Sequence, residues 1–314
     1  MRRLLFVFLD GVGLGPPSDA NPLASTILPA FDELAGGQPW TDALQSVETN
    51  RRLVRPIDAA LGVEGLPQSG TGQASLFTGV NCAELVGRHF GPFPHSDTHE
   101  VLATHSVFHQ LAALNGSPSS ETGFSASSAF ANAYPPRFFE FARGRGRWTV
   151  TTRACLEAGV EVRGLEALRE GRALTADLTG AAWRNQLELD VENISVAEAG
   201  RRLAALSRDH RFTLYEYFLT DKLGHGRLDV APASLLGQLD TFFEALLASL
   251  DPEVETLVIT SDHGNLEQMD VKTHTRHPVP LLVYGWAAPF FQSVNDLTGV
   301  TPALVEALRD EARE

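Results

Sequence analysis

Short apolar runs that end in aspartate recur along the chain. The three runs are Leu4 to Leu9 before Asp10, Leu214 to Leu219 before Asp221, and Leu257 to Thr260 before Asp262, with Glu216 as their one charged interruption. Nearly continuous apolar runs of this length are typical of parallel strands buried on both faces. The run Pro280 to Tyr284 predicts a fourth strand.

Helix-like stretches separate these runs, among them Val196 to Leu206 and Ala231 to Leu250. The alternation predicts an α/β fold with a mostly parallel central sheet and helices on both faces. Ligands bind beyond the carboxyl ends of the strands in such sheets. We therefore expect Asp10, Asp221 and Asp262 to meet at one edge.

The middle of the chain has a different composition. It holds the Gly/Arg-rich tract 142–147 and the Ser/Gly-rich stretch 115–128, and it contains none of the metal-type motifs that flank it. We interpret 88–184 as an inserted cap or substrate region, and 1–87 together with 185–314 as the core domain.

Length, charge and cysteine content narrow the class of protein. The chain has 314 residues, of which 43% are hydrophobic, and a formal charge of −14. A large core is expected, and neither a nucleic acid nor an anionic membrane is an expected partner. Two cysteines in unrelated surroundings indicate no disulfide framework and favour a cytoplasmic location.

The opening of the chain resembles the start of a secretion signal. Its apolar run covers only six residues before Asp10, so we expect a strand instead. No stretch approaches the ~18 apolar residues that a membrane span needs.

Aspartate and histidine occur together after the predicted strands. The candidate ligands are Asp10, Asp221, His225, Asp262, His263 and His274. Such side chains bind borderline divalent ions, and six of them exceed what one ion usually takes from a protein. We infer two ions, which would clamp the attacking and leaving groups of a phosphate.

Simpler interpretations stay open for single residues. An isolated aspartate after a strand is more often a helix cap, and His277 is an alternative to His274 as a ligand. We expect ordinary surface or hydrogen-bonding roles for the other histidines, which are His89, His95, His99, His105, His109 and His210.

A hydroxyl group precedes another predicted helix. Ser69 lies in the glycine-rich segment Gln68 to Gln73. At a helix N-terminus the free amides and the helix dipole favour negative charge, and a metal ion would activate the oxygen further. The alternative role of Ser69 is a helix cap.

Five motifs together resemble the ordered metal motifs of the alkaline phosphatase superfamily, nearest to its branch of cofactor-independent phosphoglycerate mutase and phosphopentomutase. They are Phe8 to Gly13, Gln68 to Gln73, Asp221 to Gly226, Thr260 to Met269 and His274 to Pro280. They cover about 1 to 85 and 195 to 314.

The resemblance implies a ligand set and a nucleophile. Asp10, Ser69, Asp262 and His263 would hold one ion, and Asp221, His225 and His274 the other, with Mn²⁺ or Zn²⁺ as the metals. Ser69 aligns with the nucleophile of the mutases. Thr71 is the alternative, although its spacing to Gly79 is two residues shorter than the pattern.

The chain departs from the mutases in its short insertion. Its two lysines, Lys222 and Lys272, are in or beside the metal motifs, so only arginines remain to bind anions there. The candidates are Arg137, Arg143, Arg145, Arg147 and Arg153. A solvated loop is the other interpretation of this tract.

The resulting hypothesis is a metal-dependent phosphomutase or phosphatase that acts on a small phosphorylated metabolite through a phosphoserine at Ser69. The alternatives are a phosphodiesterase or nucleotide pyrophosphatase, a sulfatase-type hydrolase, and a metal-binding scaffold without turnover. The sulfatase sequence Cys/Ser-x-Pro-x-Arg is absent around Ser69.

Overall fold

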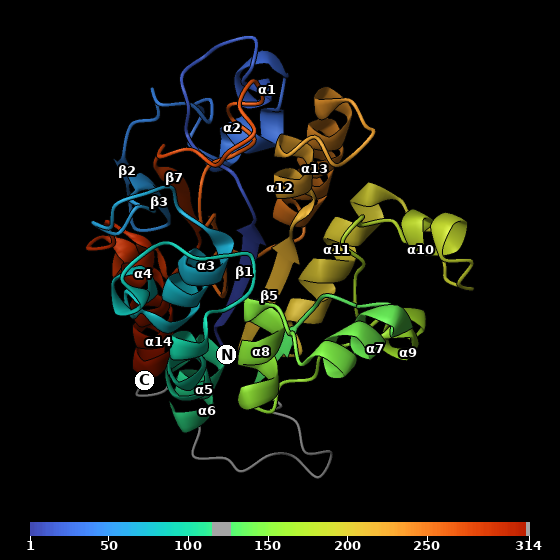
Figure 1. The fold of residues 1–314 in the computed structure, drawn as a ribbon. Coiled ribbons are helices and arrows are strands. Elements are labelled where there is room, and N and C mark those ends of the chain that lie inside the picture. The colour runs from blue at the N-terminus through green and yellow to red at the C-terminus, as the bar shows by residue number, and fades with distance from the viewer. Residues whose placement is uncertain (115–126, 312–314) are drawn as a thin grey trace.

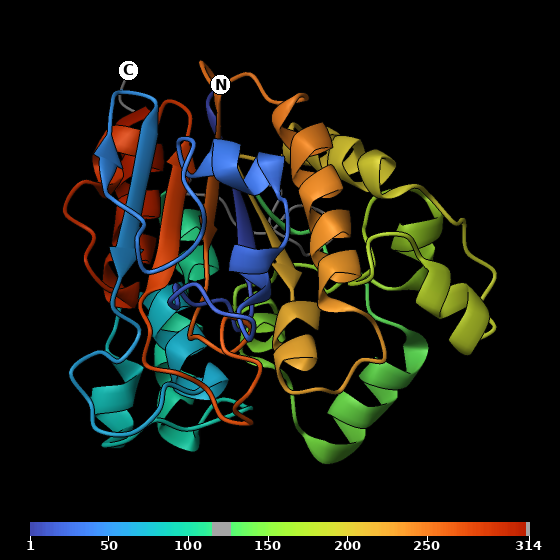
Figure 2. The same ribbon diagram turned by 90° about the horizontal axis from the view of Figure 1, so that it is seen from above.

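A mixed seven-stranded sheet forms the centre of the computed structural model, which describes residues 1–114 and 127–311. Most of the Ser/Gly-rich stretch therefore lies outside the described residues. The strand order is β2-β3-β7-β6-β1-β5-β4 (Figure 2). The strands are β1 (Arg3–Leu9), β2 (Val47–Glu48), β3 (Arg52–Ile57), β4 (Ser128–Phe130), β5 (Phe212–Tyr217), β6 (Glu255–Thr260) and β7 (Val279–Tyr284).

The predicted strands before the three aspartates are β1, β5 and β6. They lie side by side and parallel, with β1 between the other two, and β4 extends this parallel half. The fourth predicted strand, β7, instead runs antiparallel to β6. A parallel return needs a long crossover, usually a helix. The connection 261–278 contains no helix, so the chain turns back directly and β7 pairs with β6 in the opposite direction.

Alternate side chains of β1 enter two hydrophobic cores. Leu4, Phe6 and Phe8 pack on one face of the sheet, whereas Leu5, Val7 and Leu9 pack on the other. This period of two buries the strand completely. The prediction of an α/β fold with helices on both faces is confirmed.

Figure 1 shows the helices on the two sides of β1 and β5. The first core includes residues of α3 (Ser69–Thr78), α4 (Cys82–Val86), α5 (His99–His105), α6 (Val107–Leu114), α8 (Val150–Glu157) and α14 (Val300–Glu311). The second includes residues of α1 (Pro22–Ser25), α2 (Pro29–Leu34), α11 (Val196–Ser207), α12 (Leu219–Gly224) and α13 (Pro232–Leu247). Short 3₁₀ helices span Ser96–Thr98, Ala288–Phe291 and Leu297–Gly299.

The region 88–184 contributes to both the sheet and its surroundings. β4 pairs with β5, and α5 and α6 join the first core. By contrast, α9 (Leu165–Arg169) and α10 (Ala181–Gln186) pack in a small separate cluster. α7 (Pro136–Arg145) precedes them and lies near α9, since a Cβ at Gly164 would lie 3.5 Å from the ring of Phe139. The division into core and inserted cap stays a prediction.

Within residues 1–114 and 127–311, no helix combines the length and the apolar character that crossing a membrane requires.

The contact between α11 and α13 depends on Gly200. A Cβ at this position would lie 2.5 Å from the carbonyl oxygen of Phe242 and 3.0 Å from the amide nitrogen of Leu246. We expect Gly200→Ala to lower the free energy of unfolding by roughly 1–3 kcal/mol, because the helices must separate. Urea unfolding followed by circular dichroism measures this change.

Gly237 on α13 provides the matched control, because a Cβ there meets no atom within 4 Å. Gly237→Ala should raise the free energy of unfolding by about 0.5–1 kcal/mol, since alanine is the better helix former. Equal stability of the two alanine variants would contradict the packing argument.

Candidate active site

Three aspartates from three adjacent strands meet at one edge of the sheet. Asp10 directly follows β1, Asp262 follows β6 after one residue, and Asp221 lies in α12 just after β5. Because these strands are parallel neighbours, their carboxyl ends open on the same side.

A first cluster combines Asp10, Asp262 and His263, each of which offers one ligand atom within 4.8 Å of the others. Nε2 of His263 lies 3.5 Å from Oδ1 of Asp10 and 3.4 Å from Oδ2 of Asp262. The same nitrogen is 2.9 Å from Oγ of Ser69. The four residues that the resemblance assigns to one ion are thus adjacent.

A second cluster combines Asp221 and His274, with His263 within the same 4.8 Å limit. Nε2 of His225 lies 3.4 Å from Oδ1 of Asp221 and 3.1 Å from Nε2 of His274. The rings of His263 and His274 stack with centroids 3.8 Å apart. The two clusters therefore adjoin through these imidazoles.

The donor atoms fit divalent ions. Nδ1 of His274 is 2.7 Å from the carbonyl oxygen of Pro67, so it carries the proton and leaves a lone pair on Nε2. Nδ1 of His263 faces the carbonyl oxygen of Gly264 in the same way. Oδ1 of Asp10 and Oδ2 of Asp262 are buried without a hydrogen-bond partner among the described residues. A divalent cation between these oxygens and nitrogens would satisfy their lone pairs.

Burial shifts the pKa values of these groups strongly. Burial, followed by the charge of Asp262, raises the pKa of Asp10 well above its ordinary value. Burial lowers the pKa of His263 to about 4, and burial together with His263 lowers the pKa of His274 to about 4. The imidazoles are thus neutral near pH 7, as metal ligands must be.

Ser69 occupies the first position of α3, after Gln68 as the N-cap. One turn further along, the side chain amide of Gln73 donates to Oδ2 of Asp10 at 3.4 Å. A Cβ on Gly70 would lie 2.2 Å from the carbonyl oxygen of Phe93, so a glycine is required for the loop to cover this turn. Thr71 is fully buried, and its hydroxyl group accepts from the amide of Phe90 at 3.1 Å.

Two residues of the fourth motif support the ligands without belonging to either cluster. Asn265 donates to Oδ1 of Asp221 at 2.7 Å. Buried Glu267 accepts from the amides of Gly13 and Asn265 at 2.9 and 2.8 Å. His277 is 3.0 Å from Glu267, outside both clusters, whereas His274 lies inside one. Sequence reasoning assigned Asn265 and Glu267 no role, although both lie in a quoted motif.

The six remaining histidines belong to neither cluster within the described residues. Burial lowers the pKa of His89, which is 3.3 Å from the carbonyl oxygen of Val63. His95 pairs with Asp97. These positions agree with ordinary structural roles.

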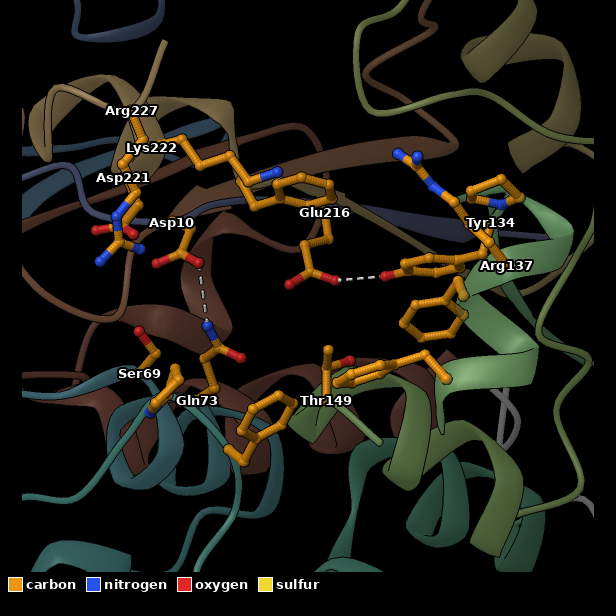
Figure 3. A pocket seen from close by; sticks show the side chains of 16 residues that line it. Asp10, Ser69, Gln73, Tyr134, Arg137, Thr149, Glu216, Asp221, Lys222 and Arg227 are labelled. Atoms are coloured by element: carbon orange, nitrogen blue, oxygen red, sulfur yellow. Dashed lines mark hydrogen bonds between the residues drawn. The ribbon is translucent and has the colours of Figure 1, made fainter. Parts of the chain in front are cut away.

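A cavity of about 690 Å³ opens in front of Ser69 and Asp10 (Figure 3). Its polar lining includes Arg137, Lys222 and Arg227. Partial burial, then the charges of Arg137 and Arg227, lower the pKa of Lys222, so the three cations lie close enough to repel one another. They form a positive rim in an acidic protein.

The predicted substrate arginines separate into three groups. Arg137 lines the cavity at Ser69. Arg147 and Arg153 line a second cavity of about 410 Å³, and Phe93 borders both cavities. Arg143 and Arg145 lie over the rings of Phe139 and Phe141 and line neither cavity.

Glu216 is a lining residue that the sequence marked only as an interruption. Its carboxylate accepts from the hydroxyl of Tyr134 at 3.3 Å, and the side chain lies between Asp10 and Tyr134 (Figure 3). Burial raises the pKa of Glu216 to about 7.

Known proteins share parts of this chain. The family model of the Metalloenzyme superfamily matches residues 179–311. A 2,3-bisphosphoglycerate-independent phosphoglycerate mutase of Legionella pneumophila is 30% identical over 109 residues, which cover 32% of this chain and 21% of that protein. The enzyme of the same name from Pyrococcus abyssi is 28% identical over 93 residues, which cover 30% of this chain and 22% of that enzyme. The chain thus matches about a fifth of these relatives' length.

Solved structures share the fold over nearly the whole chain. The match to PH0037 from Pyrococcus horikoshii covers 98% of this chain and 97% of PH0037, with a TM-score of 0.54 and 14% identity. Alkaline phosphatase from the Antarctic bacterium TAB5 covers 97% of both chains, with a TM-score of 0.53 and 11% identity. Phosphoglycerate mutase from Leishmania mexicana covers 98% and 95%, with a TM-score of 0.50 and 12% identity.

These matches confirm the resemblance stated from the motifs. The chain is similar to metalloenzymes of the alkaline phosphatase and phosphoglycerate mutase type in fold, and to the mutases in sequence over part of its length. Together with the two clusters, the family match supports the binding of divalent ions.

Removing one carboxylate should have opposite effects on the stability of the metal-free protein and on its stabilisation by metal ions. Asp10→Asn is expected to stabilise the metal-free protein, because it relieves repulsion from Asp262, yet to lose most of the gain from added Mn²⁺. For the parent protein that gain is about 2.7 kcal/mol at an ion concentration 100 times Kd. Thermal unfolding with chelator and with Mn²⁺ measures both effects.

The matched control is His105→Asn, which changes an exposed histidine outside both clusters. It should keep the full stabilisation by Mn²⁺. An equal gain in Asp10→Asn and in the parent would show that the first cluster holds no ion.

Glu216 should make stability depend on pH. Its pKa is about 7 in the folded chain against the ordinary 4.5, so the folded state holds the proton across this window. The stabilisation is complete below about pH 4.5 and is lost as the pH rises to about 7, by at most ~1.4 kcal/mol per pH unit.

Glu216→Gln lacks this titration and keeps an acceptor for Tyr134. The free energy of unfolding of the parent relative to Glu216→Gln should therefore fall between pH 4.5 and 7, as urea unfolding at fixed ion concentration would show. A difference that stays constant with pH would argue against a buried, protonated Glu216.

Proposed function

We propose that the chain transfers the phosphoryl group of a small phosphate ester to Ser69 and then to water, as a metal-dependent phosphatase. The observation that carries the proposal is the position of Ser69, whose Oγ lies 2.9 Å from Nε2 of His263 at the first turn of α3. A hydroxyl beside a metal-type cluster and a helix N-terminus suits a nucleophile.

Two ions, Mn²⁺ or Zn²⁺, belong to this proposal. Asp10, Ser69, Asp262 and His263 would hold one, and Asp221, His225 and His274 the other. When bound, such ions lower the pKa of the serine hydroxyl and neutralise charge on the phosphoryl oxygens. Asn265 and Gln73 keep Asp221 and Asp10 in position through their amide groups.

The chain's own groups account for the transfer. Oγ of Ser69 loses its proton to solvent and forms a bond to phosphorus, while the bond to the leaving oxygen breaks and that oxygen takes a proton from solvent. The dipole of α3, at whose N-terminus Ser69 lies, favours negative charge on Oγ. Attack by water on phosphoserine then restores the hydroxyl group and releases phosphate.

The rim cations attract the substrate. Arg137, Lys222 and Arg227 line the cavity and are exposed to solvent. With a formal charge of −14 the protein repels anions at a distance, so these local charges must guide a phosphate toward Ser69. Guanidinium groups suit phosphate geometrically.

Water is the proposed acceptor because the cavity is roomy and its rim side chains are exposed. A phosphomutase is the second candidate, favoured by the mutase names of the relatives similar over 32% and 30% of this chain. It would need a cavity that excludes water around the phosphoserine.

Ser69→Ala should lower kcat for the hydrolysis of aryl phosphate with Mn²⁺ or Zn²⁺ by about 10³-fold or more, since it removes the hydroxyl that forms the phosphoserine. Acid quenching and mass spectrometry should find phosphate on Ser69 in the parent. Thr71→Val tests the alternative nucleophile and should keep the label. Undiminished hydrolysis by Ser69→Ala would rule out Ser69 as the nucleophile.

The fate of 3-phosphoglycerate distinguishes the two candidates. We expect free phosphate without an isomerised product, because water reaches the phosphoserine. Phosphorus NMR of the reaction mixture follows both products. Accumulation of 2-phosphoglycerate without free phosphate would replace the phosphatase by a mutase.

A further inference from the structure

We propose that the leaving group of the substrate is a large aromatic or similarly apolar alcohol, bound by the aromatic wall of the cavity in front of Ser69. This inference rests on the phosphoryl transfer proposed above. It names the substrate class by its chemistry: a phosphate ester with one anionic end and one apolar end.

The wall is formed by five aromatic side chains from three separate segments. They are Phe93, Tyr134, Phe138, Phe141 and Phe218, and Pro92 and Pro135 add to it. Tyr134 and Phe138 stack with ring centroids 4.1 Å apart. Phe141 is 45% exposed although it is large and apolar. Apolar surface left open in a cavity is typical of a binding site for an apolar group.

The cavity has two chemically different ends, as Figure 3 shows. Asp10, Ser69, Asp221, Lys222 and Arg227 lie at one end, and Tyr134, Arg137 and Thr149 toward the other. Nζ of Lys222 lies 4.6 Å from the ring centroid of Phe218, so the cationic rim and the aromatic wall are in contact. A phosphate at Ser69 therefore places its ester group toward the rings.

A small polar ester fits this space poorly. Phosphoglycerate has little apolar surface to cover the rings, and a cavity of about 690 Å³ exceeds its size several-fold. Glu216 lies between the two ends and supplies no positive charge for a carboxylate. Arg137 lies on the Tyr134 side, but it is exposed to solvent and close enough to Lys222 to lower its pKa, so its charge faces the opening of the cavity.

The test compares two esters with leaving groups of nearly equal basicity, 3-phenylpropyl phosphate and n-propyl phosphate, on the metal-loaded enzyme. Burial of the phenyl ring should raise kcat/KM on the order of 10- to 100-fold. Phe138→Ala should reduce this ratio about tenfold, because it removes a ring from the wall.

Phe139→Ala provides the matched control on the same helix. Phe139 packs on Phe138 and Trp148 but does not line the cavity. Its truncation removes the same group and should leave the ratio unchanged. A ratio near one in the parent, or equal reductions in both variants, would overturn the inference.

A binding measurement makes the inference independent of turnover. Calorimetry on metal-loaded Ser69→Ala should find 3-phenylpropylphosphonate bound about tenfold or more tightly than propylphosphonate. Equal affinities would overturn the inference, whereas turnover of both esters at equal rates would overturn it and leave the phosphatase standing. Absence of phosphoserine and of turnover with every ester would refute the phosphatase and overturn the assignment of a leaving group with it.

Discussion

The structure depends on one electrostatic constraint: buried carboxylates and imidazoles from adjacent parallel strands and their loops lie within hydrogen-bonding or ligand distance of one another. Asp10 and Asp262 each place an oxygen about 3.5 Å from Nε2 of His263. Without a cation, burial and repulsion among the carboxylates raise the pKa values of Asp10 and Asp262, because a buried charge without a partner costs several kcal/mol. Divalent ions bound between these groups would replace the repulsion by attraction, because they carry the largest local charge in such a site.

The fold holds this edge together through its strands and the loop after β6. Parallel β5, β1 and β6 bring their carboxyl ends together, and two cores anchor β1 from both faces. The connection 261–278 carries ligands of both clusters, and buried Glu267 organises it. Hydrogen bonds from His277 and Thr275 lower the pKa of Glu267 despite its burial.

Local patterns were enough to predict β1, β5, β6 and β7, the α/β class and the convergence of the aspartates, because a buried strand and the carboxylate at its end both leave a mark in the sequence. They did not predict β2, β3 and β4. They could not predict the antiparallel direction of β7, which follows from a connection without a helix. The roles of Glu216 and Asn265 also depend on tertiary contacts across the sheet. Likewise, the spacing of the cap arginines did not predict that only Arg137 reaches the cavity at Ser69.

The candidate site has two parts. The two metal-type clusters and Ser69 lie at one end of the cavity, and the aromatic wall lies toward the other. Anomalous diffraction at the manganese edge, from crystals grown with Mn²⁺, tests the central claim most directly. The account predicts two peaks, one among Asp10, Ser69, Asp262 and His263, and one among Asp221, His225 and His274. Well-ordered crystals with no peak at either cluster would contradict it.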